Sequence, residues 1–546
     1  MSFMSRISSF FGGASQRAHA FGGGSRAYDA GSYDSREMGE WNPGINHPDG
    51  EINMTRDRIV ARARDLDRNN PIISGGVDRR AETVVGARIR PEFQPAFEAM
   101  GRTADWADDW ATAAENEFHI WAYNSRKICD VERHSQFGGL VETAYRHWWV
   151  DGEACAAIYQ LDRGGTYQTA VKLIDPDRLS NPDGMADNSL LANGNRVVGG
   201  VELDRHGAPV AYHIRVKHPA EMQAGEGAFR WERIVLETKM GRPQFVHAYQ
   251  RKRAEQRRGV SKLVSSMKKT KMFDRYDNAE LEAALLNAIN AFFIESAAPT
   301  ADVAQMFAPT GGDQDRGWNL EKQLDYRRKN RIKVSGTQVI HGLPGEKFSP
   351  LKAERPSANY PEFQATGLRS IAAAFGLSYP QLSQNWADIN YSSARTLLNE
   401  IWRGLLHDRW LFTQAFCTPI CSAWLEEAVA IGKVKVPGGA LNFYRWRDAL
   451  CLYEWMGPGR GSIDPKKESE ASDLDLAAGR TNLALEAADR GLDRRQVLMG
   501  LARDRKLREK FGIAEPVPPQ KGAGRPSGDD EDNDARDARE RAGEDA

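Results

Sequence analysis

The chain lacks an apolar run long enough to cross a bilayer. A membrane-spanning helix needs about 18 consecutive apolar residues, and no segment of the sequence approaches that length. Near the N-terminus, Ala18-His19-Ala20 resembles a signal-peptidase site, but Ser and Gly interrupt the segment before it and leave no apolar core for a signal peptide. We therefore expect no membrane span and no secretion signal, and a flexible arm over residues 1–50.

Cysteine is also scarce. The chain has five cysteines, an odd number scattered along the sequence, which argues against a disulfide framework. Cys417 and Cys421 stand one helical turn apart, but no second pair of Cys or His completes a zinc site. We expect buried free thiols, no bound metal and no cofactor.

The sequence has none of the common catalytic motifs. The Gly-rich segment 311–318 lacks the Gly-Lys-Ser/Thr ending of a phosphate-binding loop, and there is no Gly-x-Ser-x-Gly or His-Glu-x-x-His. The carboxylates that remain are Asp105 and Asp108 in a helical segment and Asp175-Pro-Asp177 at the end of an expected strand. A solvated helix face and an Asp-Pro turn explain them best. The alternative is a metal-dependent nuclease that uses Asp105, Asp108, Asp175 or Asp177.

Basic and acidic side chains are nearly equal in number. The chain has 546 residues, with 74 basic and 75 acidic side chains, so its formal net charge is -1. This balance excludes a protein that binds nucleic acid through overall charge, but not a local basic patch. The length suggests three or four domains, and 41% hydrophobic residues are typical of a globular chain. Fourteen tryptophans indicate extensive packing or assembly surfaces.

The hydrophobic periodicity predicts an α+β fold. Residues 51–70 are helical in pattern up to Asn69-Asn70-Pro71, and residues 83–90 (TVVGARIR) are strand-like. A tryptophan-rich helical region follows, with Trp106, Trp110, Phe118 and Trp121 on its apolar side. Between residues 150 and 250 the period changes to that of strands, which we expect at 154–161, 169–174, 197–203, 209–216 and 244–249.

Long helices dominate the second half of the chain. We expect one over residues 259–296, roughly 57 Å long at about 1.5 Å per residue, with a bend near Lys271. A second spans 360–375 and ends at Gly376, and a third runs from Ser393 to about Val429 with a kink at Pro419. Helices then continue to Phe511, and the acidic segment 516–546 has the composition of a solvated tail.

Two basic clusters stand out. Residues 251–275 hold ten basic side chains against Glu255 and Asp274, and Arg327-Arg328-Lys329-Asn330-Arg331 forms the second cluster. Each is compatible with a solvated face, an acidic partner or contacts to phosphates that do not read sequence. A monomeric DNA-binding protein that uses the first cluster is therefore a further alternative.

The order of these elements, together with several short motifs, resembles the portal proteins of tailed bacteriophages, specifically the lambda-type family. The resemblance covers about residues 50–515. The most specific segment is 356–402 (RPSANYPEF…IAAAFGLSYPQLSQNWADINYSSAR…W), and its core is Asn390-Tyr-Ser-Ser-Ala-Arg. Other segments that carry it are 70–80, VKLIDPDRL (171–179), GVELDRHGAPVAYHI (200–214), Arg258-Gly-Val-Ser, and Pro458-Gly-Arg-Gly followed by Asp464-Pro-Lys-Lys-Glu.

The resemblance implies a portal fold: an α/β wing, long stem helices, a small α/β clip and a helical C-terminal crown. The implied map is a flexible arm (1–50), wing (51–258), stem helix (259–296), clip (297–354), stem helix (355–376), channel loop (377–394), long kinked helix and wing return (395–450), crown (451–515) and disordered acidic tail (516–546).

The resemblance also implies a non-enzymatic function. Portal proteins form rings, usually of about twelve subunits, at one capsid vertex, and double-stranded DNA passes through the ring during packaging and ejection. The implied partners are copies of the chain itself, DNA without sequence preference, terminase, the head–tail adaptor, and the major capsid or scaffold protein. The implied location is the virion, and the host cytoplasm during assembly.

The resemblance places two sets of residues in functional regions. The residues expected at the DNA channel are Lys262, Lys268, Lys269, Lys271, Gln384, Asn385, Trp386, Asp388, Asn390 and Tyr391. The residues expected to bind partners at the clip are Arg327, Arg328, Lys329 and Arg331.

Overall fold

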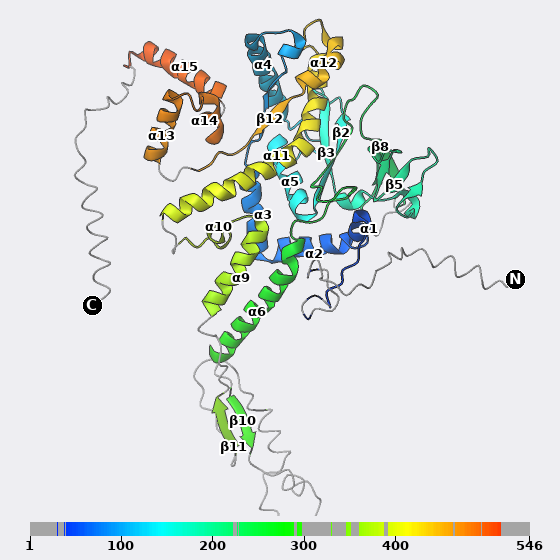
Figure 1. Ribbon diagram of the computed structural model, residues 1–546, viewed down its shortest axis with the longest axis vertical. Coiled ribbons are helices and arrows are strands. Elements are labelled where there is room, and N and C mark those ends of the chain that lie inside the picture. The colour runs from blue at the N-terminus through cyan, green and yellow to red at the C-terminus, as the bar shows by residue number, and fades with distance from the viewer. Residues whose placement is uncertain are drawn as a thin grey trace, which may run out of the picture.

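A mixed helical and β-sheet body carries two long helices that extend from it side by side, α6 (Val264–Ala288) and α9 (Tyr360–Phe375) (Figure 1). The computed structural model describes residues 41–221, 229–288, 292–296, 346–350, 360–386, 391–461, 465–492 and 494–514, with a few isolated positions besides. Helices and sheets alternate irregularly along the chain rather than in repeated βαβ units, so the α+β prediction is confirmed.

The N-terminal part of the body is helical. Asn70 joins two of its helices: it ends α2, and its side-chain oxygen accepts the backbone N–H groups of Ile72 and Ile73, at 3.1 Å each, to cap α3. Pro71 occupies the first turn of α3, where it loses no helical hydrogen bond. The predicted helix boundary at this point is thus confirmed. The helices are α1 (Pro48–Asn53), α2 (Arg56–Asn69), α3 (Pro71–Val84), α4 (Ala104–Ala122) and α5 (Phe137–Val150).

Two antiparallel sheets form the β portion. In the first, β2 (Glu153–Gln160) lies between β3 (Thr169–Ile174) and β9 (Phe245–Tyr249), so β2 is its central strand and is almost fully buried. The second is a five-stranded meander in chain order. Its strands are β4 (Ser189–Leu190), β5 (Arg196–Val198), β6 (Val201–Leu203), β7 (Pro209–Arg215) and β8 (Trp231–Val235).

Two further strand pairs join segments that are distant in the sequence. β1 (Arg90–Phe93) pairs antiparallel with β12 (Tyr453–Met456), which ties the N-terminal helices to the C-terminal third of the chain. β10 (Phe292–Ser296) pairs with β11 (Glu346–Pro350) beyond the ends of α6 and α9 (Figure 1).

The predicted strand over residues 83–90 is wrong in position. Val84 still belongs to α3, and the strand β1 begins only at Arg90. The helix ends where Gly86 takes the left-handed conformation (φ 61°) and its N–H donates to the Ala81 carbonyl, which is how glycine commonly terminates a helix. Two buried valines before this glycine gave the segment its strand-like composition.

Aromatic residues from three helices form the core of the body. Trp121 and Phe118 of α4, Phe137 of α5 and Trp424 of α11 (Tyr391–Ala430) pack with ring centroids 5.1–6.0 Å apart. The indole N–H of Trp121 donates to the Thr169 carbonyl at 2.8 Å, so its burial leaves no unpaired donor. The predicted burial of Trp110, Phe118 and Trp121 is confirmed, and Trp106 is partly buried.

The predicted helix over 259–296 is shorter than expected at both ends. Before α6, Gly259 lies so close to Gly152 that a Cβ atom would stand 2.1 Å from the Gly152 carbonyl oxygen, and this contact holds the segment in a non-helical path. After α6, Phe292–Ser296 pairs with a strand some fifty residues later, which local periodicity cannot reveal. The predicted second and third helices are confirmed as α9 and α11, and α11 continues through Pro419.

The remaining helices lie in the last third of the chain, and the first of them, α10, follows α9. They are α10 (Tyr379–Ser383), α12 (Phe443–Leu450), α13 (Pro465–Ala477), α14 (Leu483–Asp489) and α15 (Arg494–Phe511). No helix in the part of the chain that the structure describes has the length and apolar character needed to cross a membrane. All five cysteines are free thiols, and four of them are buried, as predicted.

Candidate nucleic-acid interface

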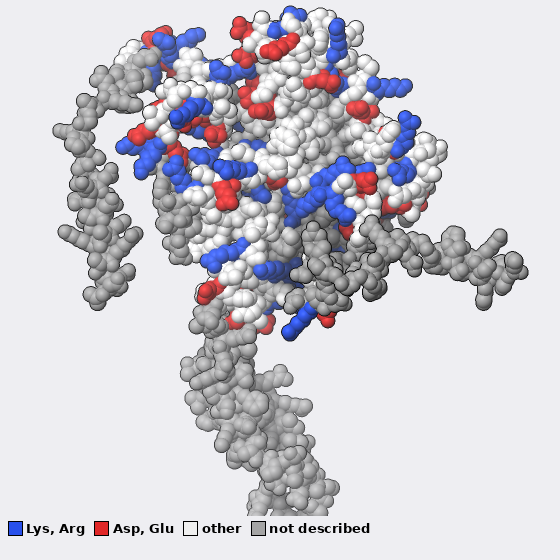
Figure 2. All heavy atoms as spheres, viewed as in Figure 1, with Lys and Arg blue, Asp and Glu red and all other residues white. Residues whose placement is uncertain are grey.

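Several exposed basic side chains of the first basic cluster lie on α6. Lys268, Lys271 and Arg275 are spaced by three and four residues, so they share one face of the helix, and all three are exposed. Lys271 lies 3.4 Å from Asp274, an exposed pair that contributes little stability. We call these three residues the α6 basic face. Lys and Arg side chains gather near the base of the paired helices in Figure 2.

Lys269 points in a different direction from the α6 basic face. Its ammonium donates to the Ser370 hydroxyl of α9 at 2.6 Å, so this lysine joins the two long helices. Aromatic stacking continues the contact along the pair: Phe273 and Tyr276 of α6 pack on Phe363 of α9, with centroids 6.4 and 4.6 Å apart. Such packing fixes the orientation of α6 and therefore the direction in which the α6 basic face points.

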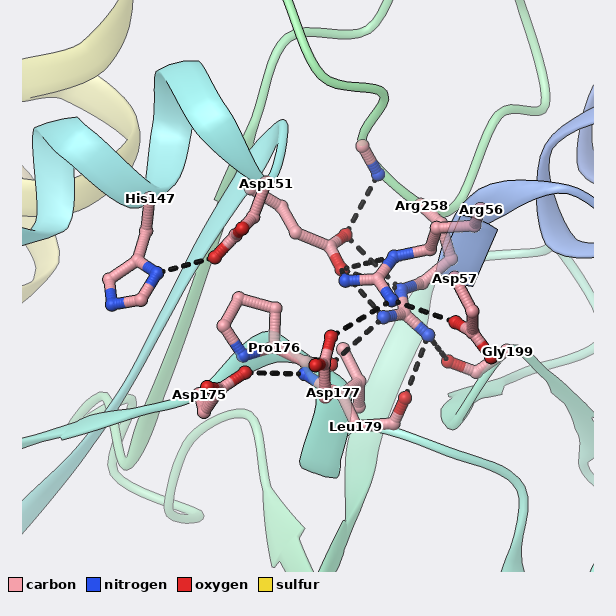
Figure 3. Close-up of polar contacts among 12 residues, drawn as sticks. Arg56, Asp57, His147, Asp151, Asp175, Pro176, Asp177, Leu179, Gly199 and Arg258 are labelled. Carbon is pink, nitrogen blue, oxygen red and sulfur yellow. Dashed lines mark hydrogen bonds and ion pairs between the residues drawn. The ribbon is translucent and has the colours of Figure 1, made fainter. Parts of the chain in front are cut away.

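A buried ion cluster holds the chain just before α6. The side chain of Glu153 in β2 is fully buried, and the guanidinium groups of Arg56 and Arg258 both contact its carboxylate. Figure 3 shows the two arginines side by side. Arg258 contributes the shortest bond, 2.6 Å from Nη2 to Oε1, and Arg56 donates from Nε at 3.1 Å. His247 of β9 and the backbone N–H of Gly259 complete the set at 2.9 and 2.8 Å. We call these groups the Glu153 cluster.

The carboxylate of Glu153 is well compensated, since two guanidinium groups, His247 and the backbone N–H of Gly259 all contact it. Burial alone would raise the pKa of Glu153, but the charges of Arg258 and Arg56 outweigh it and hold that pKa well below its usual range. Arg258 also donates to the carbonyls of Leu179, Gly199 and Pro176. The cluster thus joins α2, the central sheet and the segment that enters α6, and it fixes the base of the long helix to the body.

A second buried ion pair, Lys262 with Asp408, lies four residues after Arg258. The ammonium of Lys262 donates to Asp408 of α11 and lies 5.0 and 5.1 Å from the ring centroids of Trp148 and Trp149. Burial lowers the pKa of Lys262 to about 8, even though Asp408 opposes the shift. The Tyr145 hydroxyl donates to the same carboxylate at 2.5 Å. This pair joins the start of α6 to α11 and α5.

Lys262 therefore has a position different from the exposed one that the sequence prediction assumed. Its side chain is only 12% exposed and its charge is compensated by Asp408, so in this conformation it has no surface to offer to DNA. Arg258, which belongs to the same basic cluster in the sequence, is likewise buried. The basic residues at the start of α6 thus differ in role. Arg258 and Lys262 are buried and anchor the helix, whereas Lys268, Lys269, Lys271 and Arg275 lie exposed along it. Arg251, Lys252 and Arg253, which precede Arg258, are exposed as well.

The predicted channel loop begins after α10. Ser378 and Gln381 form a capping box at the start of this helix, and Gln384 ends it in the left-handed conformation (φ 58°). The Gln384 amide donates to the Gln381 carbonyl at 2.7 Å, so it serves the helix end, while Trp386 is 47% exposed. Asn385 is exposed next to it. Asp388 and Asn390 lie outside the described residues, as does the side chain of Tyr391.

Most of the second basic cluster lies outside the described residues. Arg327, Arg328 and Arg331 lie outside the described residues, and Lys329 is an isolated described position. Their expected role in partner binding stays a prediction.

Three of the four carboxylates of the nuclease alternative are paired with arginines. Asp175, Asp177 and His218 come together, with possible ligand atoms within 4.8 Å of one another. Arg64, however, donates to Asp175 at 3.0 Å and to Asp177 at 2.7 Å, which supplies the positive charge that a cation would provide. Asp108 pairs with Arg495 instead, and Asp105 lies with it on the exposed face of α4, a different element. The four aspartates are therefore not one cluster.

Comparison with known proteins gives a consistent result. A family model described as "Phage portal protein, lambda family" matches residues 34–409, more than half of the chain. The portal protein of Escherichia phage N15 is 28% identical over 483 residues, which cover 87% of this chain and 89% of that protein. Portal protein B of Escherichia phage lambda is 27% identical over 488 residues, covering 88% and 89%.

Solved structures resemble the chain only loosely. A chain from the neck of a native gene transfer agent (GTA) particle, computed with C12 symmetry, matches with 14% identity and a TM-score of 0.39 over 80% of this chain and 93% of that one. A HK97 family phage portal protein from Corynebacterium diphtheriae matches with 10% identity and a TM-score of 0.30, over 61% and 83%. At these TM-scores, the weight of the comparison rests on the family model.

Proposed function

Because this chain belongs to the lambda family of phage portal proteins, we propose that about twelve copies assemble into a ring at one capsid vertex and conduct double-stranded DNA along the ring axis. Portal function follows from membership of the family, whose model matches residues 34–409. The number of copies and the residues that contact DNA belong to the proposal.

The α6 basic face is the observation that supports a DNA-contacting role for the stem. A ring repeats Lys268, Lys271 and Arg275 once in every subunit, so three exposed charges become a band of charge around the axis. Lys and Arg bind the phosphate backbone without reading bases, and such contacts permit sliding. Moving DNA requires contacts of this kind, since tight base-specific contacts would hold it in place.

The domain assignment follows the elements of the fold. We assign the wing to the two sheets and the helices around them, the stem to α6 and α9, and the crown to the helices after β12. The channel loop is the segment between α10 and α11. The clip is the segment between the stem helices, most of which lies outside the described residues.

The partners follow from this assignment. We propose that the clip binds terminase during packaging and the head–tail adaptor afterwards, and that the wing and crown contact the major capsid or scaffold protein. The chain would assemble in the host cytoplasm and remain in the virion at the portal vertex. We propose no catalytic activity of its own, since arginines pair with Asp108, Asp175 and Asp177, three of the carboxylates that a nuclease would use.

Deleting residues 384–391 is expected to leave ring assembly intact and to impair DNA packaging or retention. The reason is that the capping box of α10 lies at its N-terminus, before the deleted segment. Asn385 and Trp386 are exposed and connect α10 to α11. The measurement compares ring mass and nuclease-protected DNA in particles made with the deleted and the intact chain. Loss of rings after the deletion would show that the segment holds subunits together, contrary to the proposed role.

A further inference from the structure

The C-terminal helices α13, α14 and α15 bury almost nothing within the chain. Among the described residues from 465 to 514, Ala487 alone is buried. No residue of α13 is buried, and nearly every residue of α15 is exposed. Helices of 7 to 18 residues are marginal in water without a packed face. These helices therefore need a surface that the single chain does not supply.

Large apolar side chains on all three helices are exposed in the single chain. Leu474 of α13, Leu485 of α14, and Leu501 and Phe511 of α15 are between 58% and 67% exposed. Leu498 stands one helical turn before Leu501 on α15 and is also exposed. So many exposed large apolar side chains on three consecutive helices favour an interaction site over ordinary surface.

The three helices are attached to the body at only a few points. Arg495, in the first turn of α15, pairs with Asp108 and Glu115 of α4 at 3.1 and 3.0 Å. The backbone N–H of Arg460 donates to the Asp489 carbonyl at the end of α14, at 2.8 Å. The rest of α15 extends beyond these points, beside α14 and away from the body (Figure 1). The attachments fix the helices in place and leave their apolar sides open.

The charges of the helices are segregated. α15 carries seven basic side chains and two acidic ones, whereas α13 and α14 together carry six acidic and two basic ones. Arg503, Lys506 and Lys510 share one face of α15 at spacings of three and four residues, and all are exposed. Exposed acidic residues of the other two helices are Glu470, Asp473 and Asp489. Figure 2 shows side chains of both signs over these helices.

We propose that α15 of one subunit packs against α13 and α14 of the next copy of the same chain. The apolar sides bury one another, and the basic face of α15 meets the acidic residues of the neighbour. A surface that carries one sign on one side and the opposite sign on the other suits a head-to-tail contact, the kind that closes into a ring. The inference rests on the proposed ring and specifies which helices hold adjacent subunits together at the crown.

Two charge-reversed variants test this pairing. The first carries Arg503→Glu, Lys506→Glu and Lys510→Glu, and the second carries Glu470→Lys, Asp473→Lys and Asp489→Lys. Each variant alone places like charges across every contact, so the concentration needed for half of the chains to be in rings should rise about tenfold or more. In an equimolar mixture the two variants can alternate around the ring, which restores opposite charges at every contact. The mixture should therefore assemble nearly as well as the unaltered chain.

The measurement is mass photometry over a dilution series, with circular dichroism of each variant to verify folding. The substituted side chains are exposed, so the folded structure should be unaffected. A control variant, Lys433→Glu with Lys435→Glu, reverses exposed charges outside these helices and should assemble normally.

The outcomes separate failure of the proposed helix pairing from failure of the proposed ring. Variants that assemble as well as the unaltered chain overturn the pairing. Variants that assemble poorly alone and are not rescued by mixing also overturn it, and would assign the basic face of α15 to another partner such as nucleic acid. If the unaltered chain itself forms no ring, the proposed function fails, which is a result distinct from failure of the pairing.

Discussion

Replacing Glu153 with alanine is expected to lower the free energy of unfolding by about 3–5 kcal/mol, because the change leaves the buried Arg56 and Arg258 without a counter-charge. The loss is larger than that of an ordinary surface pair because the carboxylate is fully buried and also accepts hydrogen bonds from His247 and the backbone of Gly259. Urea unfolding followed by tryptophan fluorescence measures the change. A loss below about 1 kcal/mol would contradict the role given to the Glu153 cluster.

The same carboxylate predicts how stability depends on pH. The pKa of Glu153 in the folded chain is well below its ordinary value of 4.5. The stability that ionised Glu153 contributes is therefore fully present above about pH 4.5. It decreases as the pH falls below that value and is lost when the pH reaches the lower pKa of the folded chain. The Glu153→Ala variant should show a weaker acid dependence than the unaltered chain. Glu232→Ala is the matched control: this exposed residue of β8 should change stability by no more than about 0.5 kcal/mol.

Reversing the α6 basic face is expected to weaken DNA binding by rings about tenfold or more without preventing assembly. The variant carries Lys268→Glu, Lys271→Glu and Arg275→Glu, and all three side chains are exposed, so the fold should not change. Each reversal replaces an attraction to phosphate with a repulsion, and a ring multiplies the effect by the number of subunits. The dependence of binding on salt should also become shallower, since fewer counterions are released.

The measurement is binding of linear double-stranded DNA to purified rings over a range of salt concentrations. The matched control reverses Arg58, Arg62 and Arg68 instead, which are exposed basic residues on α2. This control should bind DNA as the unaltered ring does. Equal losses in both variants would mean that total charge, rather than the α6 basic face, governs binding.

The sequence predicted the long helices and most strands because their signals are local. Gly376 ends α9 and the Asn70-Pro71 pair separates α2 from α3, and such residues act through their own backbone. The strand misplaced at residues 83–90 was also decided locally, by the left-handed Gly86, and a reading that gave this glycine its weight as a helix end would have found it.

The division of the basic cluster could not be predicted, because it depends on partners far away in the sequence. Arg258 is buried against Glu153, 105 residues earlier, and Lys262 against Asp408, 146 residues later. Charge counting alone treats these residues and Lys268 as equivalent. The end of α6 could not be predicted for the same reason. Phe292–Ser296 is a strand because it pairs with Glu346–Pro350, which lies far along the sequence.

The most direct test of the central claim is the mass and shape of the purified full-length chain, measured by light scattering and negative-stain microscopy. The account predicts a species of about twelve times 60.9 kDa with a central hole. A chain that stays at 60.9 kDa at high concentration and binds DNA as a monomer would contradict it.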